Sequence, residues 1–177
     1  MQGQPTKIGK YEVVDLIGRG GMGVVYKARD PQLDRLVAIK MIIGANPALL
    51  KRFDVEARST AGLQHQNIVT IYDFGSQDGN PYLVMEYLEG SSLESVISSG
   101  RSITLANKLR ICINICNGLS YAHERGIIHR DIKPANVMLL NDDSVKIVDF
   151  GIARIGDTGI SRTEVVGSLH YLSLIHI

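Results

Sequence analysis

The chain has 177 residues with 19 basic and 18 acidic side chains, and its formal net charge of +1 gives no electrostatic footprint for nucleic acid or an anionic membrane. Hydrophobic residues make up 45%, as in ordinary globular domains, and no uncharged apolar run reaches the roughly 18–20 residues of a membrane span. The N-terminus lacks an apolar signal core, so we expect a cytoplasmic protein, with room for a membrane anchor downstream of residue 177.

The first half of the chain is dominated by β-branched and aromatic runs separated by turn residues, which predicts strands. One helix interrupts them at residues 46–63, where Asn46 can cap the helix and Pro47 suits its first position. A turn at residues 78–80 joins the last two strands. The strands are expected at residues 11–17, 24–28, 36–42, 68–74 and 81–86.

After Gly90 the pattern becomes helical. Ser91 and Glu94 form a capping box for a short helix, and residues 104–123 have the period of a long amphipathic helix. Two short strands follow at residues 137–140 and 145–148. A strand-rich lobe therefore precedes a helix-rich lobe, with the boundary near residues 88–90.

The two cysteines lie on the long helix. Cys112 and Cys116 share a stripe with Leu105, Leu109 and Leu119 at spacings of three and four. We expect both to be apolar core residues rather than a disulfide or a metal site, since no further Cys or His lies at a suitable offset.

A glycine cluster at residues 18–25 fits the pattern G-x-G-x-x-G-x-V, which lets backbone amides approach phosphates closely. By itself the pattern also suits a flexible turn or a dinucleotide-binding fold. The dinucleotide fold needs a helix directly after the glycines. Val24, Val25 and Tyr26 favour a strand instead, so we expect the glycines to join two strands as a flap.

Lys40 ends the third strand and shares a strand face with Ala38. Glu56 lies within a mostly apolar stripe of the following helix, and a carboxylate there needs a cation such as Lys40. An alternative orientation turns a face with Leu50 and Ala57 inward and exposes Glu56. The helix pattern alone leaves both orientations open.

The strongest signal is the run from His129 to Asn136, followed by Asp149 at the end of a strand. Asp131 can orient a substrate hydroxyl and accept its proton, and Lys133 can neutralise charge on a moving phosphoryl group. Asn136 and Asp149 offer the few oxygen ligands that suit Mg²⁺ in the presence of a phosphate substrate.

These four motifs occur in the order typical of protein kinases. From about residue 9 to residue 173 the chain resembles a eukaryotic-like, bacterial-type Ser/Thr protein kinase catalytic domain, C-terminally truncated. The resemblance implies an α+β, two-lobed fold, with a five-stranded antiparallel N-lobe and an incomplete helical C-lobe. The expected segments are an N-terminal extension at 1–10, the N-lobe at 11–89, a partial C-lobe at 90–173 and an atypical tail at 174–177.

The resemblance also implies transfer of the γ-phosphoryl group of ATP to protein Ser or Thr hydroxyls, with Mg²⁺ as cofactor. Lys40, Glu56, Asp131 and Lys133 take the catalytic roles, and Asn136 and Asp149 hold the metal. The expected ATP-binding residues are Ile17, Gly18, Arg19, Gly20, Gly21, Met22, Gly23, Val24, Val25, Ala38, Lys40, Met85, Glu86, Leu88, Ser92 and Met138.

Other residues receive supporting roles from the same resemblance. His129 is structural and packs beneath Phe150, while Ser92 either contacts ribose or caps a helix. Arg130 before Asp131 suggests control by phosphorylation after Gly151, which includes self-association for autophosphorylation. The candidate phosphosites are Thr158, Ser161 and Thr163.

Three alternatives remain open at this level. The chain after Ser173 departs from the family pattern, which allows an inactive truncated fragment. A pseudokinase-like nucleotide-binding module is opposed by the intact motif residues, and a small-molecule phosphotransferase by the full glycine loop and Lys133. We therefore expect protein substrates, no nucleic-acid partner and no membrane span within this chain.

Overall fold

The computed structural model describes residues 5–20, 23–44, 53, 57–58 and 60–150. These residues form two compact units. The first contains the chain up to Ala61 together with Thr70–Tyr87, and the second contains Gly62–Val69 together with the chain from Leu88 onward.

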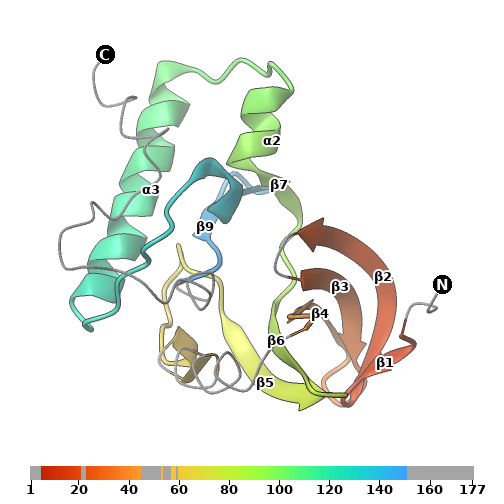
Figure 1. Ribbon diagram of the computed structural model, residues 1–177. Coiled ribbons are helices and arrows are strands. Elements are labelled where there is room, and N and C mark those ends of the chain that lie inside the picture. The colour runs from red at the N-terminus through yellow and green to blue at the C-terminus, as the bar shows by residue number, and fades with distance from the viewer. Residues whose placement is uncertain (1–4, 21–22, 45–52, 54–56, 59, 151–177) are drawn as a thin grey trace. The chain divides into compact units, whose positions relative to one another are not determined.

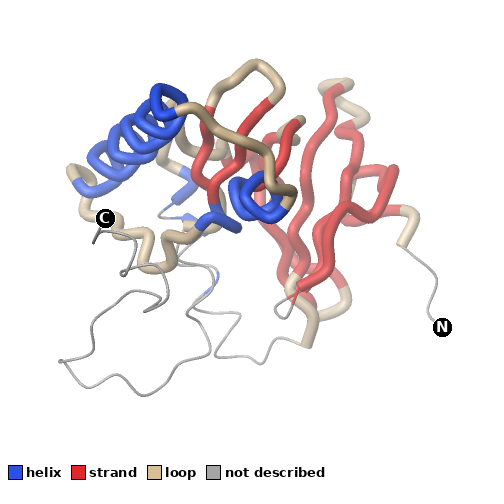
Figure 2. Tube along the Cα trace, turned by 90° about the horizontal axis from the view of Figure 1, so that it is seen from above, coloured by secondary structure: helices blue, strands red, loops and turns tan. Residues whose placement is uncertain are grey.

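The first unit is built on one antiparallel sheet with the strand order β1-β2-β3-β4-β6-β5, drawn in Figures 1 and 2. All five strands expected from the sequence are present, and an additional two-residue strand, β1, extends the edge. The strands are β1 Lys7–Ile8, β2 Tyr11–Gly20, β3 Gly23–Asp30, β4 Arg35–Met41, β5 Ile71–Gln77 and β6 Asn80–Glu86.

Side-chain hydrogen bonds explain β1, which sequence periodicity did not reveal. Gln77 accepts a hydrogen bond from the Gly9 amide at 2.7 Å and donates one to the Lys7 carbonyl at 3.2 Å. The Val13 amide also donates to the Thr6 carbonyl at 3.0 Å. Because the Gln77 side chain lies at the end of β5, about 70 positions away in the sequence, the two-residue strand β1 carries no local signal of its own.

Alternation along β3 and β4 gives the sheet two different faces. One face holds the core cluster, which includes Tyr26, Ile39 and Val84. The register pairs Lys40 with Val25 on one side and with Leu83 on the other, and pairs Ala38 with Met85. Directly paired residues share a face, so these side chains line the face opposite the core.

The second unit combines a small antiparallel sheet, in the order β7-β8-β9, with two helices and a 3₁₀ turn. α3 packs against β9 (Figure 1), and residue Ile68 forms a parallel bridge with Ile147. The elements are β7 Gly90–Ser92, α2 Leu93–Ser98, α3 Leu105–His123, η1 Pro134–Asn136, β8 Val137–Leu140 and β9 Val145–Ile147.

The helix starts are set by hydroxyl caps. Thr104, the first residue of the expected helix, caps α3 by accepting a hydrogen bond from the Asn107 amide at 3.3 Å. The cap of α2 is Ser92, which accepts from the Ser95 amide at 3.1 Å. The prediction of Ser91 as the cap was therefore wrong by one residue, because Ser91 pairs with Leu139 in the small sheet.

The buried face of α3 also differs from the expected stripe. Cys112 and Cys116 are exposed, as are Leu105 and Leu109, so the prediction that both thiols lie in the core was wrong. Burial falls instead on a second stripe through Ile111, Gly118 and Ala122.

Gly118 explains why that stripe faces inward. A Cβ at this position would lie 3.1 Å from the Asn67 carbonyl oxygen and 3.0 Å from Ile147 Cδ1. The absence of a side chain lets the helix closely approach β9 and the backbone at Asn67. Within the described residues, no helix has the length and apolar character required to cross a membrane.

Candidate active site

The chemistry-bearing residues of the second unit gather around Asp131. Lys133 Nζ lies 2.8 Å from Asp131 Oδ2, and Asn136 Nδ2 donates to the same oxygen at 3.1 Å. Asn136 Nδ2 also donates to the Asp131 carbonyl oxygen at 2.8 Å. One carboxylate oxygen thus receives a cation and an amide, while the Asp131 side chain keeps 25% of its surface exposed. The three residues come together because the 3₁₀ turn at Pro134–Asn136 folds Asn136 back toward Asp131.

His129 supports this loop from below. The ring is 2% exposed, and its Nε2 lies 2.9 Å from the Val148 carbonyl oxygen. The Asp131 amide donates to His129 Nδ1 at 3.3 Å. Because a backbone N–H occupies Nδ1, the ring proton belongs on Nε2, where it is donated to Val148. The contacts therefore define one neutral tautomer.

Burial lowers the pKa of the His129 imidazole below its ordinary value of 6.5. The hydrogen bond to Val148 and the carboxylates of Asp131 and Asp149 act in the opposite direction and are the smaller influences. A second proton would also displace the Asp131 amide from Nδ1. His129 is consequently a neutral structural residue at pH 7 and not a proton carrier.

The same network fixes the end of β9. The Val148 amide donates to the Asn136 carbonyl at 2.9 Å, so both backbone groups of Val148 bond to the loop that carries Asp131. The ring of Phe150 lies 4.6 Å from the ring of His129, centroid to centroid, and is 3% exposed. This confirms the expected packing of His129 with Phe150. Asp149, between these two anchored residues, is held next to the loop.

Two non-glycine residues adopt left-handed backbone conformations here. Arg130 has φ 64° and Asp149 has φ 61°. Such conformations cost of order 1–3 kcal/mol and persist where the surrounding contacts require them. Arg130 directly precedes the carboxylate of Asp131, and Asp149 itself carries the second carboxylate that the sequence identified, so the strain lies at the residues with proposed chemical roles.

The donor set suits a hard divalent cation. Asn136 uses Nδ2 for its hydrogen bonds, and within the described residues its Oδ1 accepts none. Asp149 supplies a carboxylate to the same region. No group of three His, Cys, Asp or Glu side chains suited to a metal exists in the described part of the chain. Two oxygen donors fit Mg²⁺, which keeps several waters and takes its other ligands from phosphates.

In the first unit the glycine cluster joins two strands and not a strand to a helix. Gly18 pairs with Val25 and Gly20 pairs with Gly23 across the β2–β3 hairpin. The predicted strand flap is therefore confirmed, and the helix that a dinucleotide fold requires is not there. Lys40 lies on the adjacent strand, beside Val25.

The glycines of this hairpin differ in what requires them. Gly23 has φ 152°, and a Cβ there would lie 2.0 Å from the Met41 carbonyl oxygen, so packing alone excludes any other residue. A Cβ at Gly18 would meet nothing closer than 3.8 Å, and one at Gly20 would meet nothing within 4 Å. Neither packing nor a positive φ accounts for Gly18 and Gly20.

Comparison with known proteins decides the family. Residues 11–173 match the family model of the protein kinase domain. The chain belongs to the protein kinase domain family. A probable serine/threonine-protein kinase of Streptomyces coelicolor, SCO3848, is 44% identical, with 96% of this chain and 27% of that protein covered. Serine/threonine-protein kinase PknB of Mycolicibacterium smegmatis is 40% identical, with 93% of this chain and 28% of PknB covered.

A solved structure confirms the fold. The PknI kinase domain of Mycobacterium tuberculosis superposes with a TM-score of 0.76 at 31% identity, covering 86% of this chain and 64% of that one. The chain spans between a quarter and a third of the length of the two serine/threonine-protein kinases named above, SCO3848 and PknB. The expected kinase-like α+β fold is confirmed.

The remaining residues predicted for the kinase site are distributed as follows. Met85 and Glu86 end β6, and Ile17 lies at an irregularity of β2, 45% exposed. Met138 is on β8, half-buried, and Ser92 caps α2, which favours the capping role over ribose contact. Leu88 follows β6, and Arg19 and Val24 lie in the glycine hairpin. Gly21, Met22, Glu56, Thr158, Ser161 and Thr163 lie outside the described residues.

Sequence reasoning missed Asn67, a buried anchor of the second unit. Its Nδ2 donates to Asn114 Oδ1 and to the Val145 carbonyl, both at 2.9 Å. Its backbone carbonyl accepts from the Ile147 amide at 2.9 Å. The available signal was a lone amide side chain directly before the apolar pair Ile68-Val69, a position where a buried polar group must find partners.

Proposed function

We propose that this chain transfers the γ-phosphoryl group of ATP to Ser or Thr hydroxyls of proteins. The observation that carries the proposal is the contact of Lys133 and Asn136 with one carboxylate oxygen of Asp131. A partly exposed carboxylate, oriented by two donors, is the group that phosphoryl transfer to a hydroxyl requires. The family match and the relatives named serine/threonine-protein kinases support the same reaction.

In the proposed step the substrate hydroxyl oxygen forms a bond to the γ-phosphorus while the bond from phosphorus to the β–γ bridging oxygen breaks. ADP carries away the electron pair of that bond. Asp131 orients the hydroxyl and accepts its proton. Lys133 places a positive charge beside Asp131, where negative charge on the transferred group is stabilised. Positioning and charge supply most of the acceleration, because the transition state is loose.

The non-core face of the large sheet suits the nucleotide. Val25, Ala38 and Met85 offer apolar contacts for adenine, and Lys40 lies on the same face for phosphate oxygens. Gly18 and Gly20 let the hairpin backbone approach the phosphates closely. This close approach would explain why glycine occupies these two positions, although a Cβ there would meet no close neighbour. The pairing of Lys40 with Glu56 belongs to the same proposal.

Mg²⁺ would be held by Asn136 Oδ1 and the Asp149 carboxylate. Bound there, it would neutralise phosphate charge and fix the geometry of the triphosphate. His129 and the backbone of Val148 hold both ligands in place before the metal arrives. The chain would therefore contribute to the metal site two oxygen ligands in fixed positions, of which the Asp149 carboxylate carries a negative charge.

Regulation and location complete the proposal. Arg130, exposed and next to Asp131, suits a phosphate on Thr158, Ser161 or Thr163, and self-association would deliver it by autophosphorylation. Protein substrates and a cytoplasmic location fit the use of ATP as phosphoryl donor. Ser/Thr specificity rests on Lys133 and on the names of the relatives.

The test measures transfer of labelled phosphate from Mg-ATP to peptides that contain Ser, Thr or Tyr as the only hydroxyl. We expect Ser and Thr peptides to be labelled, and Asp131→Asn to reduce kcat by at least about 100-fold with nucleotide affinity unchanged. Asp142→Asn, an exposed turn carboxylate outside the site, is the matched control. Labelling that survives Asp131→Asn at the unmodified rate would refute the role of Asp131.

A further inference from the structure

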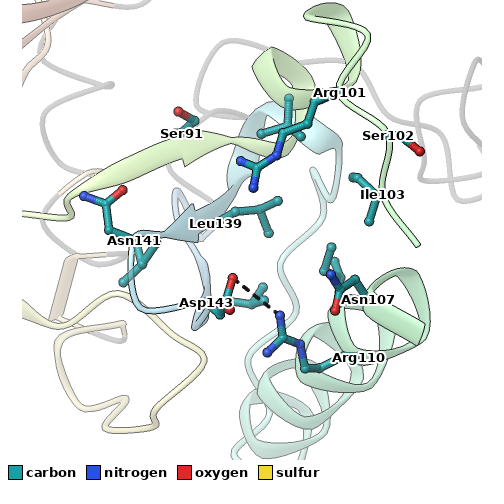
Figure 3. A pocket seen from close by; sticks show the side chains of 13 residues that line it. Ser91, Arg101, Ser102, Ile103, Asn107, Arg110, Leu139, Asn141 and Asp143 are labelled. Carbon is teal, nitrogen blue, oxygen red and sulfur yellow. Dashed lines mark ion pairs between the residues drawn. The ribbon is translucent and has the colours of Figure 1, made fainter. Parts of the chain in front are cut away.

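The second unit contains a cavity separate from the residues of the phosphoryl-transfer site. It has a volume of about 270 Å³ and is enclosed by α2, the α2–α3 connection, α3 and the β8–β9 turn (Figure 3). None of Asp131, Lys133, Asn136 or Asp149 is among the described residues that line it. The proposed reaction therefore leaves this cavity without a role.

The floor of the cavity is apolar. Ile103 and Leu139 are partly exposed there and pack against a buried cluster of this unit that includes Ile111 and Val145, which also line the cavity. A ligand that rests on this floor gains free energy by covering Ile103 and Leu139. The floor alone would suit any aliphatic group.

The charged residues at the rim of the cavity determine which ligand charge it favours. Its charged groups are two guanidinium groups and one carboxylate, from Arg101, Arg110 and Asp143. Figure 3 shows Arg101 pointing inward above Leu139, and Arg110 reaching up from α3 toward Asp143 on the turn. The sum of these charges is +1, so an anionic group is favoured.

The two arginines differ in their present partners. Arg110 lies 3.7 Å from Asp143, and both side chains are exposed, at 45% and 76%, so this pair is weak. The Arg101 guanidinium forms no hydrogen bond or ion pair within the described part of the chain. Arg101 is thus a cation held above an apolar floor, with all its donors available to an incoming oxyanion.

We propose that this cavity binds an acidic peptide segment of a protein partner, through one Asp or Glu carboxylate and a neighbouring aliphatic side chain. The carboxylate would pair with Arg101, and with Arg110 as a second donor, in the two-pronged geometry that guanidinium groups favour. The aliphatic side chain would cover Ile103 and Leu139. Charge complementarity and the floor together select this combination.

The volume of the cavity suits one or two side chains of a peptide better than a nucleotide or a molecule of similar size. Pockets that enclose small-molecule ligands span about 300–1,000 Å³, and this cavity lies just below that range. Its rim residues Ser91, Asn107 and Asn141 are exposed and can hydrogen-bond the backbone of a peptide that continues outside. This inference goes beyond the proposed phosphoryl transfer, and its test needs no ATP.

The experiment is fluorescence anisotropy with the full 177-residue chain and a fluorescein-labelled peptide of alternating Leu, Glu and Ser residues. The matched peptide carries Gln in place of Glu. We expect saturable binding of the Glu peptide below about 1 mM and at least about tenfold weaker binding of the Gln peptide, since a charge-assisted contact is lost. Equal binding of both peptides, or none of either, would overturn the proposal.

Variants assign the binding to the cavity. Arg101→Gln should weaken binding about tenfold, and Arg110→Gln less, because Asp143 already shares that guanidinium. Asp143→Asn should strengthen binding by freeing Arg110. Lys108→Gln, an equal charge change on an exposed position of α3 outside the cavity, should have little effect.

Two further results would refute binding of the acidic peptide in this cavity. Unchanged binding by Arg101→Gln would place the peptide elsewhere and refute the assignment. Inorganic phosphate that displaces the peptide completely at equal concentration would show a simple anion site without peptide recognition, which also refutes it. All four substituted residues are exposed, so folding of the variants can be verified by unchanged circular dichroism.

Discussion

The buried neutral His129 makes a specific prediction about pH and stability. Its pKa is lowered in the folded chain and close to 6.5 in the unfolded chain. Below about pH 6.5 the unfolded state therefore binds a proton that the folded state rejects. Stability from this residue is fully present above that pH and is lost as pH falls toward the folded pKa.

The magnitude follows from linkage. One proton bound only by the unfolded state changes the free energy of unfolding by about 1.4 kcal/mol per pH unit, which is the upper limit of the slope. His129→Gln removes the titrating ring while its amide can still donate toward the Val148 carbonyl. The quantity of interest is the stability of the unmodified chain minus that of the variant, because other titrating groups then cancel.

Urea unfolding followed by circular dichroism between pH 5 and 8 measures this difference. We expect it to be constant above about pH 7 and to fall steadily below pH 6.5, with a slope no steeper than the limit above. A difference that stays flat to pH 5, or that rises on acidification, would refute the neutral tautomer assigned to His129.

Three further predictions concern packing and exposure. Gly23→Ala should lower the free energy of unfolding, measured in urea, by more than about 2 kcal/mol, because its Cβ would overlap the Met41 carbonyl. Gly20→Ala should change the free energy of unfolding by less than about 1 kcal/mol and should weaken ATP binding instead. Asn67→Ala should cost about 2–3 kcal/mol, since the buried Val145 carbonyl loses its side-chain donor. A cost below about 0.5 kcal/mol, which is typical of substitutions at neutral surface positions, would show that the contact is dispensable. Cys112 and Cys116 should both react with a thiol reagent without denaturant, and protection of either would contradict their exposure.

The order and type of the elements could be predicted because local signals agree with the fold. Alternation marked the strands of the large sheet, Thr104 marked the start of α3, and the motif spacing brought Asp131, Lys133 and Asn136 together. The predictions that failed concern features that tertiary contacts determine, such as which face of α3 is buried. α3 offers two apolar stripes of similar quality, and only the close approach permitted by Gly118 selects the one with Ile111.

The site was predictable to the extent that it is contiguous in sequence. The tautomer of His129 depends on the Val148 carbonyl, 19 positions away, and the brace at Asn67 depends on residues 47 and 78 positions away. Backbone partners of this kind have no residue-type signature, so no sequence pattern can reveal them. Asn67 was detectable only as a polar residue beside an apolar pair.

These two networks act on one short segment, and this explains how Asp149 can hold an unfavourable backbone. Asn67 bonds the Val145 carbonyl through its side chain and the Ile147 amide through its backbone. The Ile147 carbonyl accepts from the Val69 amide at 2.9 Å, and both backbone groups of Val148 bond to the loop of Asp131.

The segment from Val145 to Val148 is therefore bonded from two sides before the chain reaches Asp149. A left-handed residue costs of order 1–3 kcal/mol, and the net contribution of each hydrogen bond is about 0.5–1.5 kcal/mol, so three or four such bonds are sufficient to offset it. Since Asn136 belongs to the same network, the two oxygen donors proposed for Mg²⁺ are positioned together. Loosening either Asn67 or His129 should consequently weaken metal affinity without removing a ligand.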